Sequence, residues 1–425
     1  MRSDLLIHSA GELITAPAKA GPLRGPDLDR PLVLEDAAVA CVDGRVAAAG
    51  PTAEVVAAFP EGEAGRVVDA RDLLIAPGFI DCHTHLPFAG FREMEFDARA
   101  RGLTYAEVAE RGGGIQTSVR ALRALGEEDL AARVVRRLGR LIEQGTTTVE
   151  GKSGYGLALA EERKQLRALR DAAARSDCEV IPTFLGAHEF PEEYRDRREA
   201  YVTLLLEEMI PAVAREHLAR YCDVFCDRGI FTVDQSRRLL TRAREHGLQP
   251  KVHADELADV GAAALAAELR AVSADHLLHA NPQGLRAMAD ADVVAVLLPG
   301  TALTLGLPYA PARSMIEMGL AVALATDWNP GSTMCSSMAL MMTLAVTQMR
   351  LTPAEAWMAA TANAASAVGE AARLGRVQPG YQADLVLYGP ADHRHVAYHY
   401  GEEHVRMVVK RGRIVLDRGD ISSCV

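Results

Sequence analysis

The feature that most constrains the fold is a regular alternation of apolar runs and helical stretches between about residues 76 and 375. Eight apolar runs occur there, and amphipathic stretches such as Glu127–Gln144 separate them. Strands that are apolar throughout and alternate with helices indicate a parallel sheet covered on both faces. Eight such units predict an α/β fold, a (β/α)8 barrel of the TIM type, with a doubly wound open sheet as the alternative. We expect branched apolar side chains inside this barrel and an active site at the C-terminal ends of its strands.

The two ends of the chain have a different pattern. Asp4–Ile14 reads as a β-strand, and Asp43-Gly44 is typical of a hairpin turn. The last 50 residues contain similar β-branched runs, and neither end alone is long enough to enclose a core. We therefore predict one small β-sandwich domain from residues 1–75 and 376–425, beside a catalytic barrel of residues 76–375.

Composition and charge narrow the range of partners. The chain has 46 basic and 57 acidic residues, a net charge of −11, and no block of Lys and Arg, which argues against nucleic acid or an anionic membrane. No stretch has the ~18 uninterrupted apolar residues of a membrane span, and the N-terminus lacks the apolar core of a secretory signal. The seven cysteines include no CxxC pair, which favours a reducing compartment. We therefore expect a cytoplasmic protein that binds neither nucleic acid nor membrane.

Polar residues stand where the predicted strands end. Six of them are His83, His85, His188, His253, His276 and Asp327. A strand has a period of two, so the side chains of His83 and His85 project from the same face and can chelate one metal ion. Three imidazoles and one carboxylate suit Zn²⁺ or Fe²⁺ better than Mg²⁺ or Ca²⁺. With His253 and Asp327 as later partners of this pair, the sequence predicts a metal site at the barrel mouth.

Several motifs carry a resemblance to a known family. PGFIDCHTH at 77–85, the histidines of strands five and six and ATDWNPGS at 325–332 resemble the amidohydrolase superfamily. Finer motifs resemble one family within it, the imidazolonepropionases, which open a ring in histidine degradation. These motifs are GFRE at 90–93, GGGI at 112–115, KSGYGL at 152–157, GAHEFPEEY at 186–194, HADE at 253–256, ADH at 274–276, LPG at 298–300, DWNPGS at 327–332 and YHYG at 398–401. The resemblance extends over nearly the whole chain.

The resemblance implies a role for individual residues. The implied ligands of one divalent metal per chain, Zn²⁺ or Fe²⁺, are His83, His85, His253 and Asp327. The implied substrate-binding positions are Arg92, Tyr155, His188, Glu256, Asn329, Gly331 and Ser332. The implied catalytic residues, each a candidate for the group that protonates the leaving nitrogen, are Glu256, His276 and Asp327.

A single metal is expected because of strand four. Superfamily members with two metals bridge them by a modified lysine at the end of that strand, and no lysine follows Tyr221–Cys226 here. Lys152 lies at strand two, and we interpret it as making an ion pair or hydrogen bond rather than binding metal.

The reaction implied by the resemblance is hydrolysis of the cyclic amide of 4-imidazolone-5-propanoate to N-formimidoyl-L-glutamate. The substrate is then a small anionic molecule, and we expect the enzyme to be a homodimer. A superfamily deaminase acting on a heterocyclic ring is the main alternative, because it shares the metal ligands. Arg92, Tyr155 and their motifs favour the propionate-bearing substrate. A non-catalytic scaffold is the third hypothesis, but such relatives lose metal ligands, and this chain keeps all four candidates.

Overall fold

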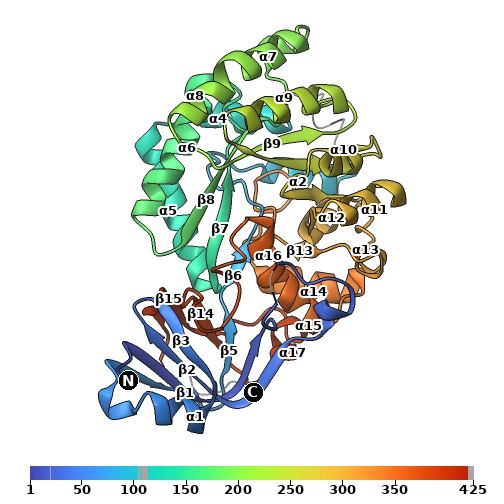
Figure 1. Ribbon diagram of the computed structural model, residues 1–425. Helices are drawn as coiled ribbons and strands as arrows, with labels where there is room; N and C mark the ends of the chain where they lie inside the picture. Colours follow the sequence, from blue (N-terminus) through green and yellow to red (C-terminus); the bar gives the residue numbers. More distant parts are fainter. Residues whose placement is uncertain (20, 104–106, 108–112, 420–425) are drawn as a thin grey trace.

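The structure, a computed structural model, describes residues 1–19, 21–103, 107 and 113–419. It consists of a barrel surrounded by helices and of a second sheet that lies below the barrel in Figure 1. Strands from both ends of the chain form this second sheet. The predicted combination of a barrel and a small β unit is therefore confirmed.

Eight parallel strands form the barrel, and their order in the sheet follows their order in the chain. The first and last strands meet beyond their C-terminal ends, where Thr84 and Trp328 form a parallel bridge. The His85 N–H also donates to the Trp328 carbonyl at 3.1 Å. This pairing closes the sheet, as a barrel requires and an open sheet does not. The strands are β6 (Phe79–Asp81), β7 (Thr146–Lys152), β8 (Glu179–Ala187), β9 (Tyr221–Cys226), β10 (Gln249–Ala254), β11 (Ser273–His276), β12 (Val294–Leu297) and β13 (Val322–Leu324).

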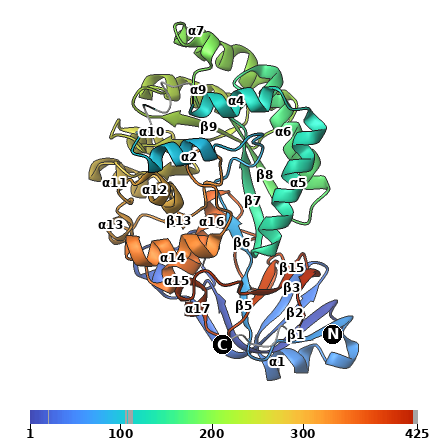
Figure 2. The same ribbon diagram turned by 180° about the vertical axis from the view of Figure 1, so that it is seen from behind.

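Helices connect these strands and lie outside the barrel in both views (Figures 1 and 2). After β6 to β9 they are α2 (Glu93–Ala100), α4 (Ile115–Arg123), α5 (Glu127–Glu143), α6 (Leu159–Ala174), α7 (Arg198–Leu204), α8 (Ile210–Arg215) and α9 (Val233–Glu245). After β10 to β13 they are α10 (Ala262–Glu268), α11 (Pro282–Asp290), α12 (Pro299–Leu305), α13 (Ala312–Glu317), α14 (Met338–Met349), α15 (Pro353–Ala360) and α16 (Ala362–Ala367).

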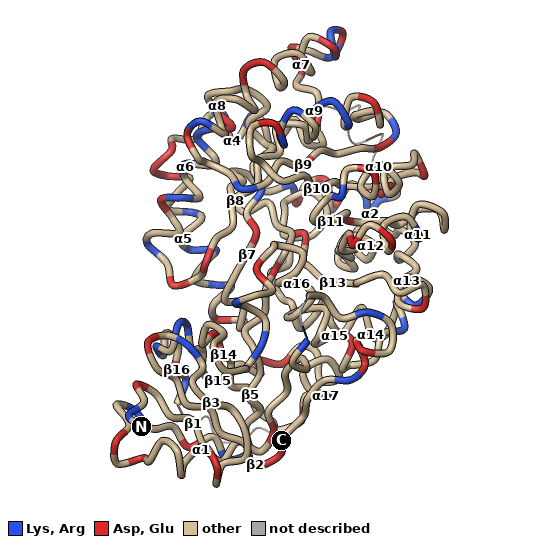
Figure 3. The backbone as a smooth tube through the Cα atoms, in the orientation of Figure 1, with Lys and Arg blue, Asp and Glu red and all other residues tan. Residues whose placement is uncertain are grey.

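The helix predicted from the amphipathic pattern is α5, whose buried face carries Leu130, Val134 and Leu138. Acidic and basic residues alternate along α5 and α6 on the outside of the molecule (Figure 3). Among the helices of the described residues, none has both the length and the apolar character that crossing a membrane requires.

The second sheet is mixed and has eight strands. Its order is β16-β15-β14-β5-β1-β2-β3, with β4 paired to β1. The strands are β1 (Leu5–Thr15), β2 (Leu32–Val42), β3 (Arg45–Pro51), β4 (Arg66–Asp69), β5 (Leu74–Pro77), β14 (Leu385–Tyr388), β15 (Val405–Lys410) and β16 (Arg413–Asp417), and its helices are α1 (Thr52–Ala58) and α17 (His393–Tyr398). The predicted hairpin turn at Asp43-Gly44 joins β2 to β3, with positive φ angles of 49° and 75°.

This sheet curls over a core of its own. The Ala383 N–H donates to the Gly44 carbonyl at 2.9 Å, and the Gly412 N–H donates to the Ala383 carbonyl at 2.9 Å. These bonds bring the β2–β3 turn against the β15–β16 turn. Inside, Leu5 and Ile7 from one end of the chain pack in one apolar cluster with Leu385 from the other end.

The barrel interior differs from the expectation of branched apolar side chains throughout. One interior cluster is apolar and joins strands that are not neighbours, through Tyr221 and Val296. Nearer the C-terminal ends the interior is ionic, because Lys152 of β7 lies 2.8 Å from Asp223 of β9 and 3.5 Å from Asp275 of β11. All three side chains are fully buried. The apolar expectation is therefore wrong for this layer, whereas the predicted ion pair of Lys152 is confirmed.

Candidate active site

The predicted site residues lie at the C-terminal ends of six barrel strands. His83 and His85 follow β6, Tyr155 follows β7 and His188 follows β8, while His253 is in β10. The remaining residues are Glu256 after β10, His276 at the end of β11, and Asp327, Asn329, Gly331 and Ser332 after β13. Parallel strands end at one edge of a barrel, and this edge carries the active site in barrel enzymes.

Two of these residues have an unusual backbone. His276 and Asp327 adopt positive φ angles of 75° and 54°. For residues other than glycine this conformation costs about 1–2 kcal/mol, and such strain gathers at functional sites. Both strained residues lie at the barrel mouth, among the predicted site residues.

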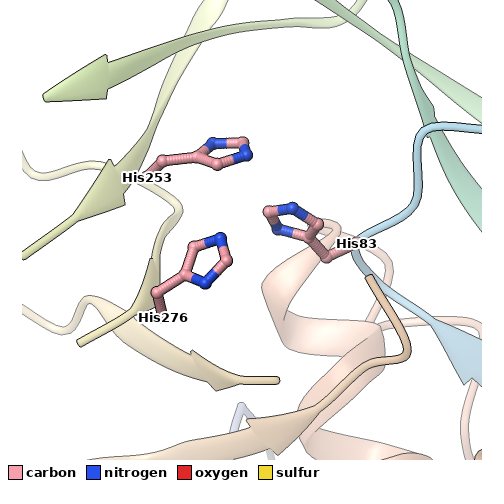
Figure 4. Close-up of side chains that lie close together, drawn as sticks. All are labelled: His83, His253 and His276. Atoms are coloured by element: carbon pink, nitrogen blue, oxygen red, sulfur yellow. The ribbon is translucent and has the colours of Figure 1, made fainter. Parts of the chain in front are cut away.

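Imidazoles converge at the centre of the mouth. His83, His253 and His276 face one another (Figure 4), and one nitrogen of each lies within 4.8 Å of the others. His83, His85 and Asp327 form an overlapping group, in which Asp327 Oδ1 lies 3.5 Å from His83 Nε2 and 3.3 Å from His85 Nε2. The four predicted ligands therefore belong to overlapping groups rather than to a single one.

The donor atoms at this centre fit a transition metal. Among the described residues, His83 Nε2, His253 Nε2 and Asp327 Oδ1 are buried and have no hydrogen-bond partner. Buried polar atoms in native proteins are normally hydrogen-bonded, so an orphaned group calls for a ligand. Imidazole nitrogens with a carboxylate oxygen are a donor set that Zn²⁺ and Fe²⁺ accept.

Carboxylates stand behind two of the imidazoles. His83 Nδ1 lies 2.6 Å from Asp275 Oδ2, a hydrogen bond in which the ring N–H donates. His253 Nδ1 lies 2.9 Å from Asp223 Oδ2. The hydrogen bond at Nδ1 fixes the tautomer and the ring orientation of His83, so that its Nε2 presents a lone pair to the centre, and Asp223 puts a carboxylate in the corresponding place beside His253.

The loop after β13, which contains Asp327 and Ser332, helps to orient the Asp327 side chain. Its Oδ2 accepts hydrogen bonds from Thr301 Oγ1 at 2.7 Å and from Ser332 Oγ at 2.9 Å, which leaves Oδ1 facing the histidines. Asn329 Oδ1 accepts from the N–H groups of Gly331 and Ser332 and so keeps the loop turned. Burial disfavours the charged carboxylate, but the close imidazoles of His85 and His276 and the hydrogen bond from Thr301 outweigh this effect and hold the pKa of Asp327 well below its usual value.

One wall of the site is aromatic. The His188 ring stacks on the His85 ring, with centroids 4.9 Å apart and an interplanar angle of 15°. His188 Nδ1 donates to the Gly154 carbonyl at 3.0 Å, and the Tyr155 ring centroid lies 5.4 Å from that of His188. Burial, together with the neighbouring His85, lowers the pKa of His188 well below its usual value. A neutral, flat imidazole surface therefore faces the centre.

Arg92 forms the edge of the site. Its Nε and Nη2 donate to Glu95 Oε2 at 3.0 and 2.7 Å, which forms a buried ion pair. Glu95 Oε1 accepts from the Gly114 N–H at 2.9 Å. A Cβ atom at Gly331 would lie 2.3 Å from Arg92 Nη1, so a side chain there would displace the guanidinium. Gly112, the first residue of the GGGI motif, lies outside the described residues.

Two titratable groups face each other across the mouth. His276 Nε2 lies 3.5 Å from Glu256 Oε2. Burial lowers the pKa of His276 to about 3, and burial together with the charges of Asp327 and Asp227 raises the pKa of Glu256 well above its usual value. At neutral pH the imidazole is therefore neutral, and the Glu256 carboxyl group takes up a proton more readily than an exposed glutamate does.

These side chains enclose a cavity of about 680 Å³. Every predicted site residue lines it except His83, which is fully buried. The volume lies in the range of small-molecule sites.

Sequence reasoning missed several groups that shape this site. Arg99 lines the cavity and donates from Nη1 to the Gly331 carbonyl at 3.2 Å. It lies seven residues after Arg92, two turns along α2, and this spacing was the available signal. Asp223 and Asp275 were also missed, although each has the strand position that faces the barrel interior.

Comparison with known proteins agrees with the site. The amidohydrolase family model matches residues 74–415. Imidazolonepropionase of Symbiobacterium thermophilum is 52% identical over 420 residues, which cover 98% of both chains. Imidazolonepropionase of Myxococcus xanthus is 47% identical and covers 99% of both chains, and that of Geobacillus thermodenitrificans is 46% identical and covers 98% of this chain and 99% of its own.

Solved structures of the same fold share less sequence. The zinc-bound adenosine deaminase of Xanthomonas campestris matches with a TM-score of 0.72 at 20% identity, over 98% of this chain and 94% of its own. Guanine deaminase of E. coli matches with a TM-score of 0.74 at 17% identity, over 97% and 100%. At such identity the likeness concerns the fold alone. From the family model and the full-length relatives, the chain belongs to the amidohydrolase family and, within it, to the imidazolonepropionases.

Proposed function

We propose that the protein hydrolyses the cyclic amide of 4-imidazolone-5-propanoate to N-formimidoyl-L-glutamate. The observation that carries this proposal is the 52% identity over 98% of both chains to a protein named imidazolonepropionase. The cavity lined by the residues expected for this substrate supports it. The deaminase alternative, which was open because deaminases share the metal ligands, gains only a common fold from structural neighbours at 17–20% identity.

We propose that one Zn²⁺ or Fe²⁺ per chain is held by His83, His85, His253 and Asp327. The orphaned nitrogen and oxygen atoms at the centre support this ligand set. Such a metal supplies Lewis acidity and lowers the pKa of water from about 15.7 to about 7.

The protein's own groups then manage the protons. Asp327 Oδ1, on an ionised carboxylate, is placed to accept a proton from the attacking water. Glu256, whose pKa is raised by burial and by the charges of Asp327 and Asp227, gives a proton to the leaving ring nitrogen. His276, which is neutral and 3.5 Å from Glu256, exchanges protons with that carboxyl group. General acid–base groups of this kind contribute about 10²–10⁴-fold to the rate.

Other residues that line the cavity orient the substrate. The Arg92 guanidinium, fixed by Glu95 and by close contact with Gly331, is placed to bind the propionate carboxylate. Tyr155 and His188 form the wall against which the planar substrate ring packs. Asn329 and Ser332 hold the loop after β13 in place beside that ring.

A direct assay separates the hydrolase from a deaminase. Purified protein is incubated with imidazolone propionate while ultraviolet absorbance and ammonia are followed together. Ring opening removes the absorbance and releases no ammonia, whereas deamination releases ammonia. Elemental analysis should find close to one zinc or iron per chain. Two metals per chain, or full activity of a chelator-treated His253→Ala variant, would contradict the ligand assignment.

We also propose that residues 1–75 and 376–425 form one folding unit, that the enzyme is a homodimer and that it works in the cytoplasm. Leu23 and Leu28 of the first segment pack with the main core of the barrel, so removal of residues 376–425 should loosen the N-terminal segment without releasing this contact. Limited proteolysis of the truncated chain tests whether the two segments form one folding unit.

Light scattering after gel filtration tests whether the enzyme is a homodimer, and cell fractionation tests whether it works in the cytoplasm.

A further inference from the structure

Beneath the metal-site histidines lies a set of charged side chains that the proposed reaction does not use. We call it the ionic layer, and its members are Glu150, Lys152, Asp223, Lys251 and Asp275. Each member is 0% exposed. With both lysines charged and all three carboxyl groups ionised, the layer carries a net charge of −1. Burying charges is costly, so such a layer persists only where its pairing is complete.

Lys152 is at the centre of this layer. Its Nζ lies 2.8 Å from Asp223 Oδ2, 3.1 Å from Glu150 Oε2 and 3.5 Å from Asp275 Oδ2. Burial acts against the ammonium charge, but Asp223, Glu150 and Asp275 outweigh it and raise the pKa of Lys152 above its usual value. One ammonium group therefore touches carboxylates from three separate strands, β7, β9 and β11.

The same two aspartate oxygens that contact Lys152 also contact the proposed ligands. Asp275 Oδ2 lies 2.6 Å from His83 Nδ1, and Asp223 Oδ2 lies 2.9 Å from His253 Nδ1. Two chains of contact thus start at one ammonium group. Each passes through an aspartate and ends at an imidazole of the metal site.

The rest of the layer is satisfied without Lys152. Lys251 Nζ donates to Glu150 Oε2 at 2.6 Å, and Thr183 Oγ1 donates to Glu150 Oε1. Ser273 Oγ donates to the other oxygen of Asp275 at 2.6 Å. Glu150 therefore has a cation of its own. Among the described residues, only Lys152 places a cationic side chain against Asp223 or Asp275.

We propose that Lys152 is a positioning residue for the metal site, acting through Asp223 and Asp275 on His253 and His83. The fixed ammonium holds the two aspartates in place, so that Asp275 accepts the Nδ1–H of His83, Asp223 stays in contact with Nδ1 of His253, and each ring leaves Nε2 toward the metal. This inference rests on the proposed ligand set and extends it to a residue one step further from the metal. The rival explanation is that Lys152 only fills and stabilises the barrel interior.

The test compares Lys152→Met with a matched control, Lys410→Met. Lys410 is also buried and ion-paired, with Nζ 2.7 Å from Asp384 Oδ2 and 3.3 Å from Glu179 Oε2, but it lies in β15 of the second sheet. Both variants should lower the melting temperature, because each leaves buried carboxylates without their cation. Only Lys152→Met should weaken metal binding, by about 10- to 100-fold, the usual effect of altering the partners of metal ligands. Metal affinity is measured by competition with a chelator.

A second readout does not depend on turnover. In protein loaded with Co²⁺, the visible spectrum reports the geometry around the metal, and Lys152→Met should change it while Lys410→Met leaves it unchanged. A double-mutant cycle adds Asp275→Asn, which removes a charge but keeps an acceptor for His83. If Lys152 acts through that carboxylate, Asp275→Asn should weaken metal binding less in the Lys152→Met background than in the wild type.

The outcomes are distinct. If folded Lys152→Met binds the metal as tightly as the wild type in chelator competition and has an unchanged Co²⁺ spectrum, the positioning role is overturned. If Lys152→Met does not fold, Lys152→Gln, which removes the charge but keeps a hydrogen-bond donor, is read in the same way. Failure of the wild-type protein itself to bind one metal would instead contradict the proposed function. If both lysine variants fail to fold while Asp275→Asn folds with unchanged metal affinity, the rival explanation stands.

Discussion

The two sheets of this protein fill their interiors in different ways. In the second sheet, Leu5 and Ile7 of β1 alternate with residues on the other face and bury apolar side chains in a shared core. In the barrel, the same two-residue period along β10 points the side chains of Lys251 and then His253 into the barrel interior. One sheet therefore uses the strand period to bury hydrocarbon, and the other uses it to stack a charged layer beneath a layer of imidazoles.

The apolar core of the second sheet mainly stabilises the fold, whereas the charged layer of the barrel mainly orients side chains. Burial of an apolar side chain contributes about 1.5–3 kcal/mol and has little directional preference. Hydrogen-bonded ion pairs in the interior contribute little net stability, yet they fix the direction of each group. Variants in the second sheet should therefore change the free energy of unfolding, and variants at the barrel mouth should change the rate.

The largest effect is expected for Glu256→Gln. The variant cannot give up a proton from its side chain, so kcat should fall about 10²–10⁴-fold while metal content stays the same. The matched control is Glu189→Gln, which alters the other glutamate that lines the cavity and should change kcat little. Loss of metal in Glu256→Gln would place Glu256 among the ligands and end the assignment of a proton-transfer role.

The opposite behaviour is expected for Leu385→Ala in β14. Leu385 is fully buried in the core of the second sheet, and its truncation should lower the free energy of unfolding by about 2–5 kcal/mol. Below the melting temperature kcat/KM should remain as in the wild type. Leu32→Ala in β2 is the control, because Leu32 is 43% exposed and its loss should cost less than about 0.5 kcal/mol. A large loss of kcat/KM in folded Leu385→Ala would break the separation of roles.

A smaller effect on rate is expected for Arg92→Met. Removal of a charge-assisted hydrogen bond of about 1.5–3 kcal/mol should lower kcat/KM roughly 10- to 150-fold. The loss should shrink for a substrate analogue whose carboxylate is replaced by a neutral group. Arg101→Met, which breaks the exposed pair of Arg101 with Asp97 just after α2, should leave kcat/KM unchanged. Equal losses for charged and neutral analogues would assign Arg92 a structural role.

The smallest effect is expected for Gly44→Ala in the β2–β3 turn. Gly44 has φ of 75°, and a Cβ there would lie 3.2 Å from the Arg411 carbonyl oxygen. The free energy of unfolding should fall by about 1–2 kcal/mol, with no change in kcat. Gly62→Ala, at a position with no neighbour within 4 Å, should be neutral or slightly stabilising. Equal melting temperatures for the two variants would show that the turn contributes nothing to the curled sheet.

Much of the fold could be predicted because its signals are local. Some barrel strands, such as β12 and β13, are continuous apolar runs, and α5 has a clear amphipathic face. The joint sheet followed from a simple length argument, since neither end of the chain can enclose a core. The pair His83 and His85 was recognisable because a strand has a period of two.

The ionic layer could not be predicted in the same way. Its contacts join strands that are not neighbours in the sheet, such as β7 with β9 and β11, and nothing in the local sequence of Lys152 names its partners. In the sequence, Asp223 and Asp275 are single acidic residues within apolar runs. Interior packing decides which of them meet. The contact of Arg92 with Gly331 is hidden for the same reason, because it joins the first and last strand ends.

The way the second sheet is completed has a consequence for synthesis on the ribosome. β5 pairs with β1 on one side, but its partner on the other side, β14, begins about 300 residues later. At about 5–20 residues per second, the growing chain carries β5 without that partner for roughly 15–60 s. An unpaired strand edge is a template for other strands, so this interval is when the nascent chain is most open to aggregation. Translation speed through the barrel, and any chaperone that covers this edge meanwhile, should therefore influence the yield of folded protein more than its final stability does.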